Sequence, residues 1–414
     1  MQPLETDVLV IGSGPGGASA AYHLARHGLD VTVVDKATFP REKVCGDGLT
    51  PRAVKAMIEM GVDTDDPGFE KVIGLRVYSR RTTVELPWPE LQTYPGYGLV
   101  MPRDGFDHLL AQRAVKAGAR LLEATEAVAP IVSDGWVLGA TMRPAGDKDA
   151  PTTEIRARFV ISSDGAASRF ATPLGVRRDD GRPLGIAARR YYRVPYHPGP
   201  WFESWLDLWD GDLLLPGYGW LFPMAGGRIN LGAGLLNTFK GFHAVSAQQL
   251  FSAFAKMLPL AWGVGEDSAD GRVLSGPLPM SLNRVPQAVP GLLLIGDAAG
   301  AVNPFNGEGI AYAMETGQIA AELLHEAIVK DRPGIAMSYP QVLRDTYGRY
   351  FFIGRQFAKI IGKPAVMGRA TRYLLPNHAV MAFALRVMGN LTDGPDGDLQ
   401  DKLFAVMQKV GRAS

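Results

Sequence analysis

The sequence has a single cysteine, no long apolar run and almost no net charge, and each absence excludes a class of protein. The lone cysteine, Cys45, rules out an intramolecular disulfide and a thiolate metal cluster. Charged residues interrupt every apolar window of about 18 residues, which excludes a membrane-spanning helix. Residues 1–7 are acidic where a secretory signal is basic. We therefore expect a cytoplasmic protein.

The 43 Lys and Arg residues nearly balance the 42 Asp and Glu residues, which leaves a formal charge of +1. Because nucleic-acid binders normally carry a strong basic excess, we expect no nucleic-acid partner. The seven histidines lack the spacing of metal ligands, so we predict no metal site. The length of 414 residues and the apolar fraction of 46% are typical of a globular chain with two domains.

The N-terminal segment predicts a strand, a glycine turn, a helix and a second strand, over residues 7–11, 12–17, 18–27 and 31–34. Gly12, Gly14 and Gly17 have the spacing of a dinucleotide-binding turn, and Asp35 ends the second strand. In such a turn the glycines allow a tight bend, close approach of a pyrophosphate and helix–strand packing, while the acid binds ribose hydroxyls. This unit predicts a dinucleotide site, either NAD or FAD.

A second motif near the other end of the chain favours FAD. Asp297 follows a buried strand expected at residues 292–295, where its carboxylate can hold the ribityl hydroxyls of a flavin. Residues 306–310 then open a helix whose N-terminal amides can stabilise the negative charge of a reduced flavin ring. Two nucleotide-facing motifs so far apart in the chain suit an elongated cofactor.

Motifs in chain order resemble the group of FAD-dependent enzymes that includes para-hydroxybenzoate hydroxylase. They are the glycine turn, Arg103 in residues 101–107, and residues 163–166, 296–297 and 303–309. Within this group, the runs PREKVCGDG and YGWLFP, at residues 40–48 and 218–223, resemble the geranylgeranyl reductase family. Residues 45–54 and 215–220 are most similar to its actinobacterial members that act on menaquinone. The resemblance extends over about residues 5–330.

The resemblance implies an FAD site built from several segments. Asp297 and residues 308–310 would lie at the ribityl chain and isoalloxazine, residues 45–48 on the substrate side of the flavin, and Arg103 and Val128 at the nucleotide half. The expected FAD-binding residues are Gly12, Gly14, Gly16, Gly17, Asp35, Lys36, Cys45, Gly46, Asp47, Gly48, Arg103, Val128, Asp164, Gly165, Asp297, Gly307, Gly309 and Ile310. The turn at Asp164 and Gly165 also resembles one that serves a pyridine nucleotide, which suggests NAD(P)H as the reductant.

Three aromatic residues alternate along one expected strand: Tyr218, Trp220 and Phe222. Alternation places the three rings on one face of a sheet. This pattern is also typical of an ordinary sheet core, but beside a flavin it predicts, with Pro223, the wall of a cavity for an apolar substrate. An isoprenoid chain has no hydrogen-bonding group and needs such a cavity.

The implied reaction is FAD-dependent reduction of a carbon–carbon double bond in a polyprenyl chain. The favoured substrate is an isoprene unit of menaquinone, and the alternative is a geranylgeranyl group. The double bond needs a hydride and a proton, and Cys45, Tyr218 or an ordered water could donate the proton. Cys45 could equally be a buried apolar residue. The alternative activity is an FAD-dependent monooxygenase or hydroxylase of a hydrophobic or aromatic substrate.

We expect an α/β fold with an FAD-binding Rossmann-like domain, an inserted antiparallel β-sheet domain for the substrate and a helical C-terminal region. The corresponding ranges are 1–75, 100–184 and 285–335 for FAD; 76–99 and 185–284 for substrate; and 336–414 for the helices. Residues 341–372 hold seven Lys and Arg and one Asp. On a helical wheel Arg344, Arg349, Arg355 and Lys359 share one face. The opposite face is apolar and holds Leu343, Tyr347, Tyr350, Phe351, Gly354, Ala358 and Ile361. Such a helix either covers this protein's own core or docks peripherally on an anionic membrane.

Overall fold

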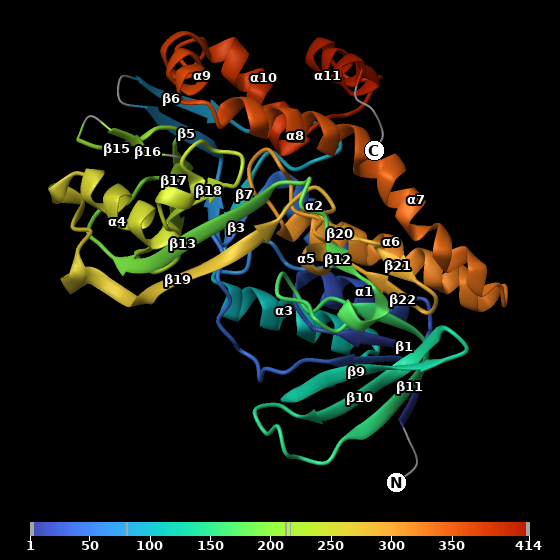
Figure 1. Ribbon diagram of the computed structural model, residues 1–414. Coiled ribbons are helices and arrows are strands. Elements are labelled where there is room, and N and C mark those ends of the chain that lie inside the picture. Colours follow the sequence, from blue (N-terminus) through green and yellow to red (C-terminus); the bar gives the residue numbers. More distant parts are fainter. Residues whose placement is uncertain (1–3, 80–81, 212, 216, 411–414) are drawn as a thin grey trace.

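The computed structural model describes residues 4–79, 82–211, 213–215 and 217–410. Pro216 of the 215–220 motif, and the ends of the predicted domain ranges at residues 1–3 and 411–414, lie outside the described residues. Two large β-sheets form the body of the molecule, and helices from the C-terminal part of the chain lie together at one end of it (Figure 1).

The first sheet has the strand order β21-β22-β11-β1-β2-β8, with β10 pairing β11 and β9 pairing β10. Strands β22, β11, β1, β2 and β8 pair in parallel. Alternate residues of β1 face opposite sides, so Val8 and Val10 pack with the helices α1, α3 and α6 while Leu9 and Ile11 pack with the β9–β10 hairpin. The elements are β1 (Leu4–Ile11), β2 (Val31–Val34), β8 (Arg120–Leu122), β9 (Thr125–Ser133), β10 (Trp136–Pro144), β11 (Thr153–Ser162), β21 (Ala288–Val289), β22 (Leu292–Leu294), α1 (Pro15–Arg26), α3 (Arg103–Ala117) and α6 (Ile310–Val329).

The second sheet has the order β19-β13-β18-β17-β14-β5-β6. All neighbouring pairs are antiparallel except β14 and β5, which run in parallel. Helix α4 covers one face, where Leu221 packs with Leu250 and Phe254. The elements are β5 (Gly74–Ser79), β6 (Thr82–Pro87), β13 (Leu184–Arg193), β14 (Trp201–Trp205), β17 (Tyr218–Met224), β18 (Arg228–Leu236), β19 (Ala269–Pro279) and α4 (Ala247–Met257).

Short elements connect these layers, and helices follow α6. The short elements are β3 (Gly48–Leu49), α2 (Pro51–Glu59), β4 (Glu70–Val72), β7 (Gly98–Val100), β12 (Arg177–Arg178), β15 (Leu208–Asp210), β16 (Leu213–Leu215), β20 (Arg284–Val285) and α5 (Gly296–Ala299). The later helices are α7 (Tyr339–Leu343), α8 (Arg349–Ile361), α9 (Pro364–Arg369), α10 (His378–Gly389) and α11 (Leu399–Val410), with π-helical turns at Arg344–Gly348 and Ala370–Leu374. Among the described helices, none has the length and apolar character needed to cross a bilayer.

The predicted fold class is confirmed, with small differences at element ends. Helix α1 begins at Pro15 rather than at residue 18, because proline fits the first turn of a helix, where no backbone N–H is needed. The predicted apolar face of α8 is buried at Tyr350 and Phe351. Arg355 does not join the exposed basic face: it is half-buried and its guanidinium donates to Ser281 Oγ at 2.9 Å. The division into domain ranges stays a prediction.

Candidate active site

One cavity of about 1190 Å³ extends from the parallel strand ends of the first sheet to the face of the second sheet opposite α4. Its two parts differ in chemistry. Glycines and charged residues, among them Asp35, Lys36 and Arg103, line the part beside the first sheet. Apolar and aromatic side chains line the part between the second sheet and the C-terminal helices.

The glycine turn after β1 lacks room for side chains at two positions. Gly12 has φ +94°, and a Cβ there would lie 2.5 Å from the carbonyl oxygen of Ser163. A Cβ on Gly17 would lie 1.8 Å from the carbonyl oxygen of Gly12, so only glycine lets α1 pack this closely on the turn. Asp35 accepts hydrogen bonds from the backbone N–H groups of Ser13 at 2.8 Å and Ala37 at 2.9 Å. The carboxylate is thereby held at the turn, where it lines the cavity.

An ion-pair cluster borders the same part of the cavity. Arg103 donates to both carboxylate oxygens of Asp107, at 2.6 and 2.7 Å, and Arg41 pairs with the same carboxylate at 2.8 Å. Both arginines line the cavity, and their guanidinium tips are the nearest atoms to a Cβ built on Gly14. Anionic phosphates placed against Gly14 would therefore meet two fixed positive charges.

The second predicted motif also borders the cavity. Asp297 lies in α5, immediately after β22, and Gly307, Gly309 and Ile310 lead into the N-terminus of α6; all four line the cavity. Positive charge density at a helix N-terminus suits the electron-rich edge of a reduced flavin. With the glycine turn, these residues fit an elongated dinucleotide. Asp164, Gly165, Lys36 and Val128 also line the cavity.

Glu308 is a half-buried residue of this loop whose carboxyl oxygen Oε2 is shielded from solvent. The hydroxyl of Thr50 donates to one of its oxygens, and Oε2 has no hydrogen-bond partner among the described residues. Burial raises the pKa of Glu308 to about 7, against the opposing effects of Thr50 and Arg52. Glu308 therefore changes charge near neutral pH at the cavity surface.

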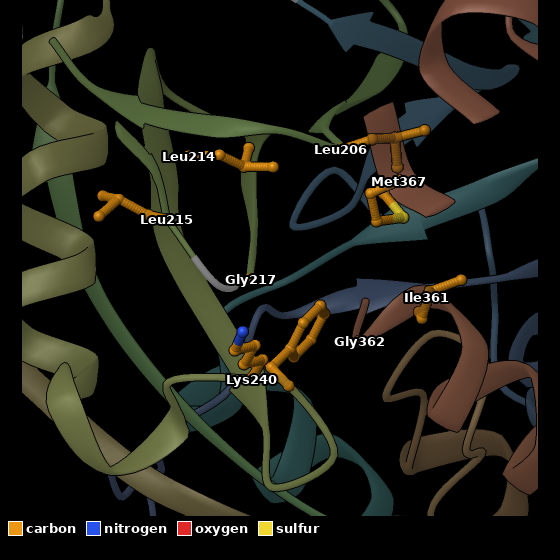
Figure 2. Close-up of a pocket in the computed structure, with 9 residues that line it drawn as sticks. Leu206, Leu214, Leu215, Gly217, Lys240, Ile361, Gly362 and Met367 are labelled. Atoms are coloured by element: carbon orange, nitrogen blue, oxygen red, sulfur yellow. The ribbon is translucent and has the colours of Figure 1, made fainter. Parts of the chain in front are cut away.

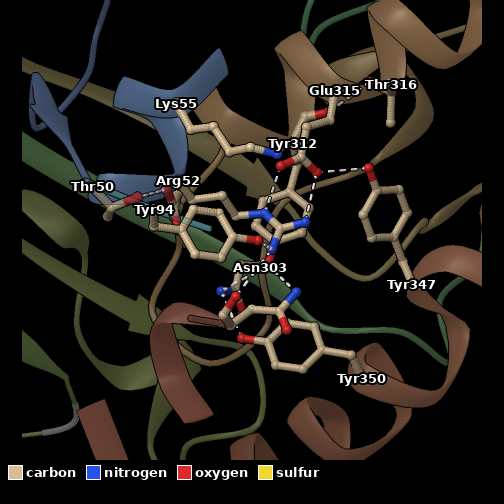
Figure 3. Close-up of polar contacts among 12 residues, drawn as sticks. Thr50, Arg52, Lys55, Tyr94, Asn303, Tyr312, Glu315, Thr316, Tyr347 and Tyr350 are labelled. Atoms are coloured by element: carbon tan, nitrogen blue, oxygen red, sulfur yellow. Dashed lines mark hydrogen bonds and ion pairs between the residues drawn. The ribbon is translucent and has the colours of Figure 1, made fainter. Parts of the chain in front are cut away.

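A polar network ties the 303–309 loop to the helices around it (Figure 3). Arg52 of α2 pairs with Glu315 of α6 at 2.6 Å, and the hydroxyl of Tyr347 donates to Glu315 at 2.8 Å. Asn303 donates to the hydroxyl of Tyr350 at 3.0 Å. These buried and partly buried bonds connect α2, the loop, α6 and the C-terminal helices, so they fix the loop in position.

The loop from Cys45 to Gly48 is held by a second network. Asp47 has φ +63° and is fully buried; it accepts hydrogen bonds from the hydroxyl of Tyr191 at 2.6 Å and from Asn230 Nδ2 at 2.8 Å. Asn230 also donates to the carbonyl oxygen of Cys45 at 2.9 Å and accepts from Trp220 Nε1 at 3.0 Å. Burial raises the pKa of Asp47 to about 6 although these hydrogen bonds oppose the shift. Asn230 therefore links the loop to the aromatic strand β17.

The two predicted proton donors both line the cavity. Burial raises the pKa of the Cys45 thiol, and the charge of Arg103 opposes this shift. Burial also raises the pKa of Tyr218 to about 12, and its hydroxyl donates to the carbonyl oxygen of Asn306 at 3.2 Å. Both groups therefore keep their protons at neutral pH.

The aromatic residues of β17 lie where their alternation predicts. Tyr218, Trp220 and Phe222 line the cavity, whereas Leu221 packs under α4. Pro223 is buried and is not among the residues that line the cavity, because an odd offset along the strand turns it to the other face. A Cβ on Gly48 would come within 3.0 Å of the Phe222 ring. The loop and the aromatic strand are thus in direct contact.

Sequence reasoning missed the contribution of the C-terminal helices. The residues of this segment that line the cavity are Phe357, Ile361, Met367, Ala370, Thr371, Leu374, Leu375, Val380, Met381, Ala384, Leu385, Met388 and Gly389. Leu375 and Leu385 also pack with Val77 and Phe202 of the second sheet. The apolar character of the segment was visible in the sequence, but its place over the second sheet depends on long-range packing.

A small pocket of about 30 Å³ adjoins the main cavity (Figure 2). Leu206, Gly217, Phe239, Ile361 and Met367 line both of them. Ile361 and Met367 of the C-terminal helices therefore lie opposite residues at the strand ends of the second sheet in both spaces.

The glycine turn, the second motif and the cavity between two sheets define a flavoprotein of the oxidoreductase class. Residues 5–187 match the FAD binding domain family. The chain is 38% identical over 395 residues to a menaquinone reductase of Mycobacterium tuberculosis, with 95% of this chain and 93% of the relative covered. It is 31% identical to a digeranylgeranylglycerophospholipid reductase of Thermoplasma volcanium, with 83% and 84% covered. The chain therefore belongs to the geranylgeranyl reductase family of FAD-dependent oxidoreductases.

Solved structures share the fold. A geranylgeranyl bacteriochlorophyll reductase-like protein from Thermoplasma acidophilum superposes with a TM-score of 0.72 at 24% identity, covering 92% of this chain and 99% of that one. A flavin-dependent brominase reaches a TM-score of 0.72 at 18% identity, with 98% of each chain covered. At these identities the likeness concerns architecture alone, so the brominase gives no specific support to the alternative oxygen-dependent activity.

Proposed function

We propose that this enzyme saturates a carbon–carbon double bond in a polyprenyl chain. The favoured substrate is an isoprene unit of menaquinone, and the alternative is a geranylgeranyl group. The proposal rests on the continuity of the cavity. The residues suited to a dinucleotide and the apolar residues of the large compartment line one and the same cavity. The substrates in the names of the two curated relatives, menaquinone and digeranylgeranylglycerophospholipid, share a polyprenyl chain. An apolar compartment fits that shared part.

The residues proposed to hold FAD are those predicted from the sequence, with Asp35 and Lys36 toward the adenosine ribose, Gly14 and Arg103 toward the phosphates, and Asp297 toward the ribityl chain. Reduced FAD, when bound, supplies the hydride. The chain's own residues exclude water, orient the polyprenyl chain against Trp220 and Phe222, and supply the proton. Cys45 and Tyr218 are the proposed proton donors from the protein, with an ordered water as the third source.

The reaction can be tested without knowing the natural reductant. FAD on the purified enzyme is photoreduced under anaerobic conditions, menaquinone is added, and the extracted quinone is analysed by mass spectrometry. The expected product has gained two hydrogen atoms in its polyprenyl chain. A product that appears only with oxygen and carries an added oxygen atom would contradict the proposal and favour a monooxygenase.

NAD(P)H is the proposed reductant, on the basis of the turn at Asp164 and Gly165. The two residues line the cavity, so a nicotinamide could approach there. The oxidised enzyme is mixed anaerobically with NADH and, separately, with NADPH. One of the two nucleotides should bleach the absorbance band of the oxidised flavin. If neither nucleotide bleaches it while photoreduced enzyme turns over, another electron donor serves the enzyme.

Peripheral association with an anionic membrane is also proposed, because a polyprenyl lipid resides in a bilayer and the C-terminal segment is basic. Arg344 donates to Gln341 Oε1 at 2.7 Å, and Arg355 turns toward Ser281. The proposed membrane contact therefore does not use the whole basic face that the helical wheel predicts, because Arg344 and Arg355 are held by these hydrogen bonds.

A further inference from the structure

Two exposed apolar side chains of the C-terminal helices also line the cavity. Of the large hydrophobic side chains that line the cavity, Val128, Leu374 and Val380 are also exposed among the described residues, at 39, 49 and 39%. Val128 belongs to the part beside the first sheet, near Glu126 and Arg143. Leu374 ends the second π-helical turn and Val380 lies in the first turn of α10, so two apolar side chains that line the cavity also reach the surface among the C-terminal helices; the place where they do so is here called the opening.

The same helical segment carries two more exposed apolar residues. Tyr373 is 65% exposed and Ile360 is 51% exposed, although neither lines the cavity. Tyr373 lies in the π-helical turn, directly before Leu374, and Ile360 lies in the last turn of α8. A cluster of exposed large apolar side chains beside a cavity opening is typical of a surface that contacts another apolar phase.

The charges around the opening have one sign. Residues 346–392 contain seven Lys and Arg and no Asp or Glu. Lys359, Lys363, Arg369 and Arg372 are exposed, and none of the four forms an ion pair with a described residue. By contrast, Arg386 is occupied by Asp398 and Asp401. Four exposed cations without an ion-pair partner among the described residues therefore lie in a stretch of the chain that has no acidic residue, from α8 to the π-helical turn after α9, at one end of the molecule (Figure 1).

We infer that the surface formed by Lys359, Ile360, Lys363, Arg369, Arg372, Tyr373, Leu374 and Val380, here called the α9–α10 surface, docks on an anionic phospholipid bilayer and admits the polyprenyl chain between Leu374 and Val380. The inference rests on the proposed function for the identity of the chain that enters. The positive charge of the α9–α10 surface complements anionic headgroups, and the apolar residues of this surface suit the boundary between headgroups and acyl chains. The lipid chain would then reach the cavity without crossing water.

The test compares two variants with the same change in charge. One carries Lys363→Gln, Arg369→Gln and Arg372→Gln on the α9–α10 surface. The control carries three substitutions at exposed basic residues elsewhere: Arg26→Gln, Lys116→Gln and Lys148→Gln. FAD-loaded wild type and both variants are sedimented with vesicles of phosphatidylcholine alone or mixed with phosphatidylglycerol, at low and at physiological salt.

Wild type and control should bind the phosphatidylglycerol vesicles, and the surface variant should bind them about 100-fold more weakly, from roughly a factor of five for each basic residue near an anionic surface. Salt should weaken wild-type binding, since charges are screened over about 8 Å at physiological ionic strength. Tyr373→Ser should weaken binding roughly tenfold with little change in salt dependence. Equal loss in both triple variants, or binding indifferent to lipid charge, would overturn the inference.

Two further measurements separate this inference from its alternatives. Sedimentation velocity without lipid should show the same species for wild type and surface variant; a dimer that the surface substitutions dissolve would assign the surface to a second copy of the chain instead. Turnover of a short-chain quinone in detergent should be equal in all forms. If no form reduces any quinone while vesicle binding follows the expected pattern, the proposed reaction fails and the docking surface stands.

Discussion

Asp47→Asn should remove a pH dependence from the stability of the protein. The side chain is fully buried, and Tyr191 and Asn230 donate to its Oδ2. Asparagine has nearly the same volume, keeps an acceptor oxygen and tolerates the positive φ of 63°. The substitution therefore removes the titration while it preserves the shape of the site.

The sign follows from the raised pKa. Since the folded protein holds the Asp47 proton up to about pH 6, whereas the unfolded chain releases it near its ordinary value of 3.8, the folded state binds more protons between these values. The stabilisation is complete below the unfolded pKa and is lost as the pH rises through the folded pKa. A difference of about two pKa units corresponds to roughly 3 kcal/mol of unfolding free energy.

Urea unfolding, followed by tryptophan fluorescence of the FAD-loaded protein, measures this effect at about pH 4 and about pH 7. Wild type should lose roughly 2.4 kcal/mol more than Asp47→Asn between the two conditions, because the unfolded chain has already released more than half of this proton at pH 4. Glu308 contributes a loss of the same sign to both proteins and cancels in the comparison. Asp134→Asn, an exposed site with φ +50°, serves as the control and should follow wild type. Parallel curves for wild type and Asp47→Asn would refute the reasoning.

Gly17→Ala should abolish FAD binding, because its Cβ would collide with the Gly12 carbonyl oxygen at 1.8 Å; flavin absorbance after purification measures this, and a fully loaded variant would contradict the tight turn. Trp220→Phe should keep FAD but leave the buried Asn230 Oδ1 unpaired, lowering unfolding free energy by about 1–3 kcal/mol; unchanged stability would show that this hydrogen bond contributes nothing. Asp297→Ala should weaken FAD affinity by about 1–3 kcal/mol, roughly 5- to 150-fold, measured by titrating the apoprotein; unchanged affinity would exclude the proposed ribityl contact.

Local sequence signals predicted the parts of the site that depend on local structure. The glycine spacing after a buried strand fixes a turn, and Asp35 follows from the length of the βαβ unit. The alternation of Tyr218, Trp220 and Phe222 likewise determines which face of a strand they share. The same rule turns Pro223 to the opposite face of β17, and Pro223 is not among the residues that line the cavity. The period of two already argues against the predicted place of Pro223 in the cavity wall.

Other parts depend on contacts that no local pattern encodes. Asn230 lies in the run RINLGAGLL, which reads as a buried strand, and its hydrogen bonds reach Cys45 and Asp47 more than 180 residues away in the chain. The segment from Phe357 to Gly389 reads only as amphipathic helices. Arg355 shows the limit of the helical wheel: the wheel gives its angular position, but the partner at Ser281 decides whether it meets solvent.

The position of the cavity's last wall within the chain has a consequence during synthesis. The dinucleotide-facing part is complete once Ala313 has been made, whereas the apolar compartment stays open until residues 357–389 have left the ribosome. For that interval the nascent chain presents the aromatic face of β17 uncovered. Cofactor binding at this stage would order the first sheet before the C-terminal helices are made. A chain truncated before α8 would leave the apolar face of the second sheet exposed to water, and such a chain would be prone to aggregation.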